Sequence, residues 1–188
     1  MSLLTVFVAV TFMCSAAGKL ASPNSLMPYL ATLGLSRHLA RQATLAVSFL
    51  ELAIGLLLLS RIAGQWVAAA AAGAAITFVI IHLASMLSHG LEPCRCFGAV
   101  DAELGATAGL IRAALLAAAA ILVAAHTWMM GHSPLEYDLY ALVSGALASF
   151  TYIIIFPLLD RVPKVLKLSR ELRAGLILLR QELDSRTR

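Results

Sequence analysis

Residues 92–99, Glu-Pro-Cys-Arg-Cys-Phe-Gly-Ala, carry the side chains best suited to chemistry in this chain. Cys94 and Cys96 are separated by one residue, although the sequence holds only 3 cysteines in 188 residues. The thiolate is the form of cysteine that attacks a disulfide, and nearby positive charge, which Arg95 can supply, favours that form. A Cys-x-Cys disulfide closes a small ring, and strained, exposed disulfides tend to be the reactive ones. The motif therefore predicts a thiol–disulfide centre.

The same sulfur atoms allow a second interpretation. Thiolates are soft ligands that suit Cu(I) or mercury, so Cys14, Cys94 and Cys96 could form a soft-metal binding or transport site. Three cysteines with this spacing are too few for a closed zinc site of four cysteines. The leading interpretation, a thiol–disulfide centre, involves no metal. A third interpretation is a loop without catalytic function in a membrane assembly factor.

The sequence around the cysteines is strongly apolar. Hydrophobic residues make up 61% of the chain and charged residues 13%, whereas about a quarter of a soluble domain is charged. Such a chain cannot cover itself with a water-facing surface, so the lipid bilayer must be its solvent. Of the 14 Lys and Arg residues, eight follow Asp160. This bias is typical of a terminal segment beside anionic lipid, and we expect no nucleic-acid partner.

Apolar runs of about 20 residues are long enough to cross a bilayer. We predict an all-α polytopic membrane helix bundle with a four-helix core, a fifth span and a C-terminal amphipathic helix. The transmembrane bundle covers residues 1–159, and the basic amphipathic tail covers residues 160–188. The five expected spans are 3–21, 43–60, 66–88, 105–128 and 138–159. Residues 22–42 are expected to interrupt them with a short interfacial helix and a basic loop.

Several ionisable side chains fall inside these spans. Glu51 lies near the middle of the second span, where a carboxylate costs a few kcal/mol and should therefore have a proton or a partner such as Lys19 or Arg112. The alternative is a purely structural buried hydrogen bond. Lys19 could alternatively extend to the lipid headgroups, and Arg112 could face the thiols or reach lipid phosphate. His82 and His89 share a helix face and could bind a metal or transfer protons, or are plain interfacial residues.

The direction of the spans decides which of these residues meet. Consecutive spans alternate in direction, so the first span ends on the side where the third ends and the fourth begins. We therefore expect one set of side chains near a single leaflet: Cys14, Lys19, His82, His89, Cys94, Cys96 and Arg112. Cys14 would supply a third thiol close to lipid, where a hydrophobic quinone could approach.

Four elements together resemble the MauE family of methylamine-utilisation membrane proteins, which is related to DoxX-like proteins. They are Ala17-Gly18-Lys19-Leu20, Glu51-Leu52-Ala53-Ile54-Gly55, Cys94-Arg95-Cys96-Phe97-Gly98 and Arg112, and the resemblance covers roughly residues 3–128. It implies a multi-pass protein of the bacterial cytoplasmic (inner) membrane, associated with disulfide formation in exported proteins. It also implies a core like that of vitamin K epoxide reductase, a separate thioredoxin-like partner and, by analogy, a quinone acceptor.

The resemblance also assigns roles. Cys94 and Cys96 match the cysteine pair of the family, and Lys19 and Glu51 match its intramembrane charged positions. Arg95 stands where glycine is common, and Cys14, the fifth span and the tail are further departures. The leading hypothesis is a thiol–disulfide oxidoreductase in which the two neighbouring cysteines exchange with partner thiols. Lys19, Glu51, Arg112 and Arg95 would then set the charge and proton balance.

Two arguments place the cysteine loop on opposite sides of the membrane. The excess of Lys and Arg in the tail indicates a cytoplasmic tail and, with five spans, a cytoplasmic cysteine loop. Oxidative folding, in contrast, belongs outside the cytoplasm. The loop either faces the cytoplasm and works reductively or faces the exterior, and labelling of intact cells with a membrane-impermeant thiol reagent distinguishes the two.

Overall fold

The computed structural model describes residues 2–32, 34–60, 64–87, 106–130 and 139–155. Its helices are α1 (Ser2–Ala21), the 3-10 helix η1 (Pro23–Ser25), α2 (Met27–Thr32), α3 (Arg37–Leu59), α4 (Gln65–Leu87) and α5 (Ala106–Met130), and a further apolar helix, Leu139–Ile155. Four of them, α1, α3, α4 and α5, are long and apolar enough to cross a membrane. The described residues form no strand. The predicted all-α membrane bundle is confirmed.

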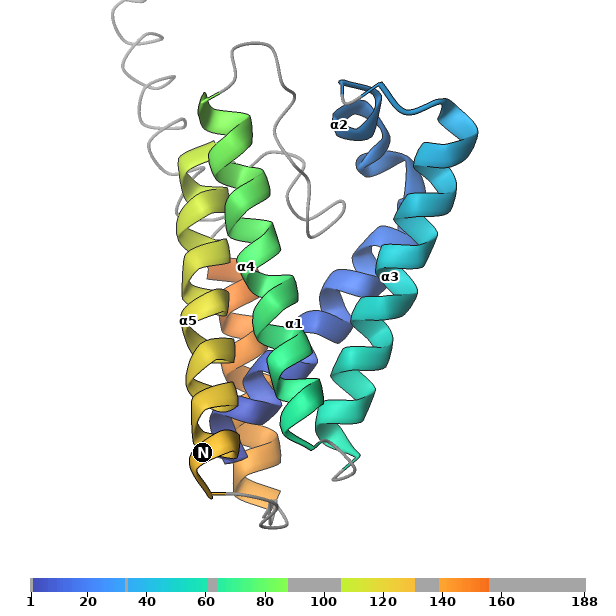
Figure 1. The fold of residues 1–188 in the computed structure, drawn as a ribbon. Coiled ribbons are helices and arrows are strands. Elements are labelled where there is room, and N and C mark those ends of the chain that lie inside the picture. The colour runs from blue at the N-terminus through green and yellow to red at the C-terminus, as the bar shows by residue number, and fades with distance from the viewer. Residues whose placement is uncertain (1, 33, 61–63, 88–105, 131–138, 156–188) are drawn as a thin grey trace, which may run out of the picture.

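The long helices form two antiparallel pairs. α1 packs along α3, and α4 packs along α5. Figure 1 shows that the two pairs diverge toward the end of the bundle at which α2 lies, here called the α2 end. Consecutive helices alternate in direction, so α1 and α4 finish at the α2 end and α5 begins there, as the sequence predicts.

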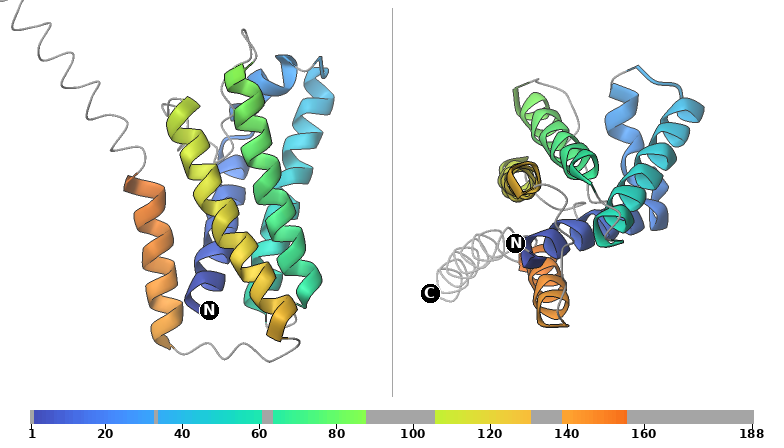
Figure 2. Two further views of the ribbon diagram at one scale, coloured as in Figure 1. Left: turned by 60° about the vertical axis from the view of Figure 1, so that its left-hand side comes forward. Right: turned by 60° about the horizontal axis from the view of Figure 1, so that its bottom comes forward.

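The helix Leu139–Ile155 packs against both pairs. The Ser149 hydroxyl donates a hydrogen bond to the Phe7 carbonyl of α1 at 2.9 Å, and the Tyr152 hydroxyl donates to the Arg112 carbonyl of α5. A Cβ atom at Gly145 would lie 2.7 Å from Val6 Cβ, so this helix approaches α1 closely. Figure 2 shows the helix beside the first half of α1.

Small residues allow the close packing within the bundle. A Cβ atom at Gly55 in α3 would lie 2.6 Å from Met13 Cγ and 2.8 Å from the Ala9 carbonyl oxygen of α1. The absence of a side chain therefore lets two helix backbones approach, as is common between membrane helices. The buried face of α4 is likewise rich in alanine: Ala68, Ala71, Ala72 and Ala75.

The outer surface has the composition expected of a lipid-facing one. Large apolar side chains such as Phe49, Ile80 and Leu122 are more than half exposed on the long helices. Trp66 at the start of α4 and Trp128 near the end of α5 stack edge to face, with ring centroids 5.7 Å apart. Tryptophan favours the boundary between lipid and water, so this pair marks the boundary opposite the α2 end. The chain is a multi-pass membrane protein.

One boundary differs from its expected position. α3 begins at Arg37, six residues before the expected start of the second span, because Ser36 caps it by accepting a hydrogen bond from the Leu39 N–H at 3.4 Å. Arg37 and Arg41 therefore lie on the first turns of a helix, and their assignment to a basic loop is wrong. Hydropathy detects only the lipid-buried part of a helix, whereas α3 starts at the level of the headgroups.

Candidate functional site

Four ionisable side chains expected to matter are buried inside the bundle. Lys19, Glu51, His82 and Arg112 are 1%, 1%, 3% and 0% exposed. They come from four different helices, α1, α3, α4 and α5. Burial of so many ionisable groups in a protein surrounded by lipid is costly, and such residues generally mark functional sites.

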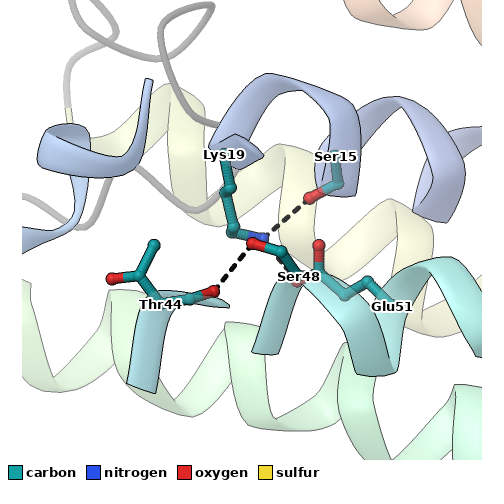
Figure 3. A network of polar contacts seen from close by, with 5 residues as sticks. All are labelled: Ser15, Lys19, Thr44, Ser48 and Glu51. Atoms are coloured by element: carbon teal, nitrogen blue, oxygen red, sulfur yellow. Dashed lines mark hydrogen bonds and ion pairs between the residues drawn. The ribbon is translucent and has the colours of Figure 1, made fainter. Parts of the chain in front are cut away.

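Lys19 and Glu51 form an ion pair between α1 and α3 (Figure 3). Helical side chains lean toward the N-terminus of their helix, so the Lys19 side chain runs back from the end of α1 over the preceding turn. There its ammonium group donates a hydrogen bond to the Ser15 hydroxyl at 2.9 Å. Lys19 thus points into the bundle, and the alternative in which it extends to the lipid headgroups is wrong.

The polar residues of α3 beside Glu51 are satisfied within their own helix. The Thr44 hydroxyl donates to the Ala40 carbonyl at 2.9 Å, and the Ser48 hydroxyl donates to the Thr44 carbonyl at 2.7 Å. Among the residues that the structure describes, Glu51 Oε2 has no hydrogen-bond partner. One oxygen of the carboxylate is therefore engaged by Lys19, and the other is an open acceptor within the bundle.

The polar site extends from this ion pair into α4. The Lys19 ammonium nitrogen lies 5.1 Å from the centroid of the Phe78 ring, which is a cation–π distance. His82 lies one turn beyond Phe78, and its ring packs on α5 where Gly109 has no side chain. A Cβ atom at Gly109 would lie 2.7 Å from His82 Cε1. Within the described ranges His82 Nε2 has no hydrogen-bond partner.

Arg112 connects the site to the helix Leu139–Ile155. Its guanidinium carbon lies 5.2 Å from the centroid of the Tyr152 ring, which is a cation–π distance. The Tyr152 ring in turn contacts Phe7 edge to face at 5.3 Å. Because the Arg112 side chain is fully buried, the alternative in which it reaches lipid phosphate is wrong.

The structure describes Cys14 but not the two neighbouring cysteines. Cys14 is a free, half-buried thiol on α1. Cys94, Arg95, Cys96 and His89 lie outside the described residues, as do residues 156–159 of the expected fifth span and the tail 160–188. Within the described part of the chain no three His, Cys, Asp or Glu side chains come together. The cysteine relay, the soft-metal alternative and the amphipathic tail stay predictions.

Three residues of the site were not identified from the sequence. Ser15 lies four residues before Lys19, and Phe78 lies four residues before His82, so the helical period could have placed each beside its neighbour. Tyr152 gives no such signal, because its contact with Arg112 joins segments that are distant in the sequence.

Comparison with known families gives one match. The model of the family described as methylamine utilisation protein MauE matches residues 1–126. Those residues include α1 to α4 and most of α5, and with them all four buried ionisable side chains. Neither the curated proteins nor the solved structures give a match.

Proposed function

Because the chain belongs to the family of methylamine utilisation protein MauE, we propose that it is a membrane thiol–disulfide oxidoreductase. It passes electrons between a thiol protein and the membrane through Cys94 and Cys96. The observation that carries this proposal is the position of the buried site. Leu87 and Ala106, between which both cysteines lie in the chain, are at the same end of the bundle as Lys19, His82 and Arg112.

The exchange itself needs only the two thiols and those of a partner. A thiolate of the reduced partner attacks one sulfur of the Cys94–Cys96 disulfide, which forms a mixed disulfide and releases the other cysteine as a thiolate. The second partner thiolate then breaks the mixed disulfide. The partner leaves oxidised, Cys94 and Cys96 are reduced, and two electrons have moved. The reverse sequence reduces the partner, and the direction depends on the potentials of the two pairs.

The buried charges support a reaction that moves protons with electrons. A buried ion pair is weak evidence for stability, because desolvation offsets most of its attraction. Lys19 and Glu51 are therefore better explained by function, as a donor and an acceptor of protons in the exchange. Arg95 and Arg112 add positive charge that favours thiolates, and His82 and His89 are the candidates for proton transfer.

A quinone is the electron acceptor that the family resemblance implies. When bound, a quinone accepts two electrons and two protons. Cys14, half-buried on the same helix as Lys19, is the proposed thiol between the cysteine pair and the membrane interior.

The partner is a thioredoxin-like protein or an exported thiol protein, and the site lies in the bacterial cytoplasmic membrane. We expect Cys96→Ser to trap this partner in a mixed disulfide through Cys94, or Cys94→Ser to trap it through Cys96. The trapped species is detected on non-reducing gels of membranes and identified by mass spectrometry. Ala99→Ser is the matched control, because it introduces a serine into the same loop and leaves both thiols in place.

Three outcomes would contradict the exchange chemistry. If neither cysteine variant traps a partner and both keep their activity, the protein is an assembly factor without redox function. If Cu(I) binding falls in both variants while the redox state of candidate partners is unchanged, the soft-metal alternative is correct. A trapped species that is equally abundant in Ala99→Ser would show that trapping does not depend on the exchange.

A further inference from the structure

The helix Leu139–Ile155 turns one face toward the bundle. Ser149 is fully buried and anchors this face on α1 through its hydrogen bond to the Phe7 carbonyl. Tyr152 lies three residues later, on the same side of the helix, and is also buried. Phe150, in contrast, is more than half exposed. The family match ends at residue 126, so the family model does not cover this helix or what it contributes to the buried site.

Arg112 is buried although its own helix places it beside lipid-facing residues. Ile111 and Leu115, its neighbours on α5, are each at least half exposed, whereas Arg112 is fully buried. α5 begins at Ala106, so Arg112 lies about 9 Å along the helix axis from that start. An arginine that faced hydrocarbon would be costly. The burial of its side chain therefore depends on the helices that pack against α5.

Tyr152 contacts both the side chain and the backbone of Arg112. Its ring centroid lies 5.2 Å from the guanidinium carbon, a cation–π distance, and its hydroxyl donates a hydrogen bond to the Arg112 carbonyl. The Phe7 ring of α1 meets the Tyr152 ring edge to face, with centroids 5.3 Å apart. The hydrogen bond fixes the tyrosine against the backbone of α5, and the ring then limits where the guanidinium can lie.

We propose that Tyr152 is a positioning residue that holds the Arg112 guanidinium inside the bundle. A long basic side chain that loses such a contact can extend toward the headgroup layer, where its charge is solvated. The positive charge of Arg112 would then leave the place from which it acts in the exchange. The effect on Cys94 and Cys96 rests on the proposed function, whereas the position of Arg112 does not.

Arginine labelling of the full-length protein, purified in a mild detergent, tests the position of Arg112. Phenylglyoxal modifies accessible guanidinium groups, and mass spectrometry locates the adducts. In the wild-type protein we expect Arg112 to stay unmodified while Arg41, which is exposed on α3, reacts. Tyr152→Leu should make Arg112 reactive. Phe150→Leu is the matched control, because it removes an aromatic ring from the exposed side of the same helix and should leave Arg112 protected.

A redox titration of membranes with glutathione tests the consequence for the thiols. Reduction of one Cys94–Cys96 disulfide oxidises two glutathione thiols to one glutathione disulfide. Positive charge that favours thiolates stabilises the reduced pair, so its displacement should make the pair harder to reduce. We expect the ratio [GSH]²/[GSSG] at half-reduction to rise about tenfold in Tyr152→Leu, equivalent to roughly 30 mV. Arg112→Gln should cause the same rise, and adding Tyr152→Leu to it should cause no more.

Phe7→Leu removes the support that α1 gives to the Tyr152 ring and should move both readings in the same direction. This variant keeps the test valid if Tyr152→Leu does not fold. The proposal is overturned if Arg112 stays unmodified in both variants, if Phe150→Leu exposes it equally, or if Tyr152→Leu shifts the titration further in the Arg112→Gln background. A wild-type pair that never forms a disulfide would contradict the proposed function instead, and the labelling would still decide the position of Arg112.

Discussion

At the scale of single residues, the buried Lys19–Glu51 pair is the main finding. The sequence alone shows that Glu51 needs a partner, because a carboxylate in the middle of an apolar span is too costly without one. It does not show whether Lys19 or Arg112 is that partner, since the choice depends on how each helix is rotated about its axis. In the structure, Lys19 pairs with Glu51 and Arg112 packs against Tyr152.

We predict that Lys19→Met and Glu51→Gln each destabilise the protein strongly, while the double variant is less destabilised than the sum of the two. Loss of one partner leaves a buried charge without its counterion, which costs about 3–5 kcal/mol, whereas removal of both charges can be nearly neutral. The measurement is the free energy of unfolding of the purified variants in one detergent, analysed as a double-mutant cycle.

Ser48→Ala is the control for this cycle, because the Ser48 hydroxyl bonds within α3 and its loss should cost about 1 kcal/mol. Strictly additive losses for Lys19→Met and Glu51→Gln would mean that the two side chains do not interact, and would contradict the pairing.

At the scale of helices, hydropathy predicts the apolar segments and their alternating directions, because run length alone decides whether a segment can span a bilayer. It misses the first turns of α3, which begin at Arg37 in the headgroup layer. A glycine inside a span, such as Gly55, is a common site of close helix contact. The sequence does not identify α1 as the helix that packs there, because this depends on the crossing of the two pairs.

Gly55→Ala should therefore destabilise the protein, and Gly73→Ala should not. A methyl group at position 55 would meet the Ala9 carbonyl oxygen, which belongs to the backbone and cannot rotate away, so we expect a loss of about 1–3 kcal/mol. Gly73 has no neighbouring atom within 4 Å, and alanine there should be neutral or stabilising by up to about 1 kcal/mol. The midpoint of thermal unfolding of each variant checks both expectations. Equal midpoints for Gly55→Ala and Gly73→Ala would refute the close contact at Gly55.

At the scale of the whole molecule, two antiparallel pairs of helices diverge toward the α2 end and enclose buried charges beneath it. The sequence predicts that α1 and α4 finish and α5 begins at this same end, because consecutive spans alternate in direction. It does not predict the line of contacts from Glu51 through Lys19 and Phe78, which needs the packing of three helices. Both neighbouring cysteines lie in the chain between α4 and α5, the two helices that meet at this end.

The redox behaviour of Cys94 and Cys96 tests the central claim most directly. Membranes would be equilibrated with glutathione mixtures of graded redox potential, and the two cysteines quantified by differential alkylation and mass spectrometry. We predict that they form one disulfide in a single reversible two-electron transition, with a tenfold change in the ratio of oxidised to reduced pair per roughly 30 mV. Two thiols that remain fully alkylated at every glutathione ratio would contradict a function in thiol–disulfide exchange.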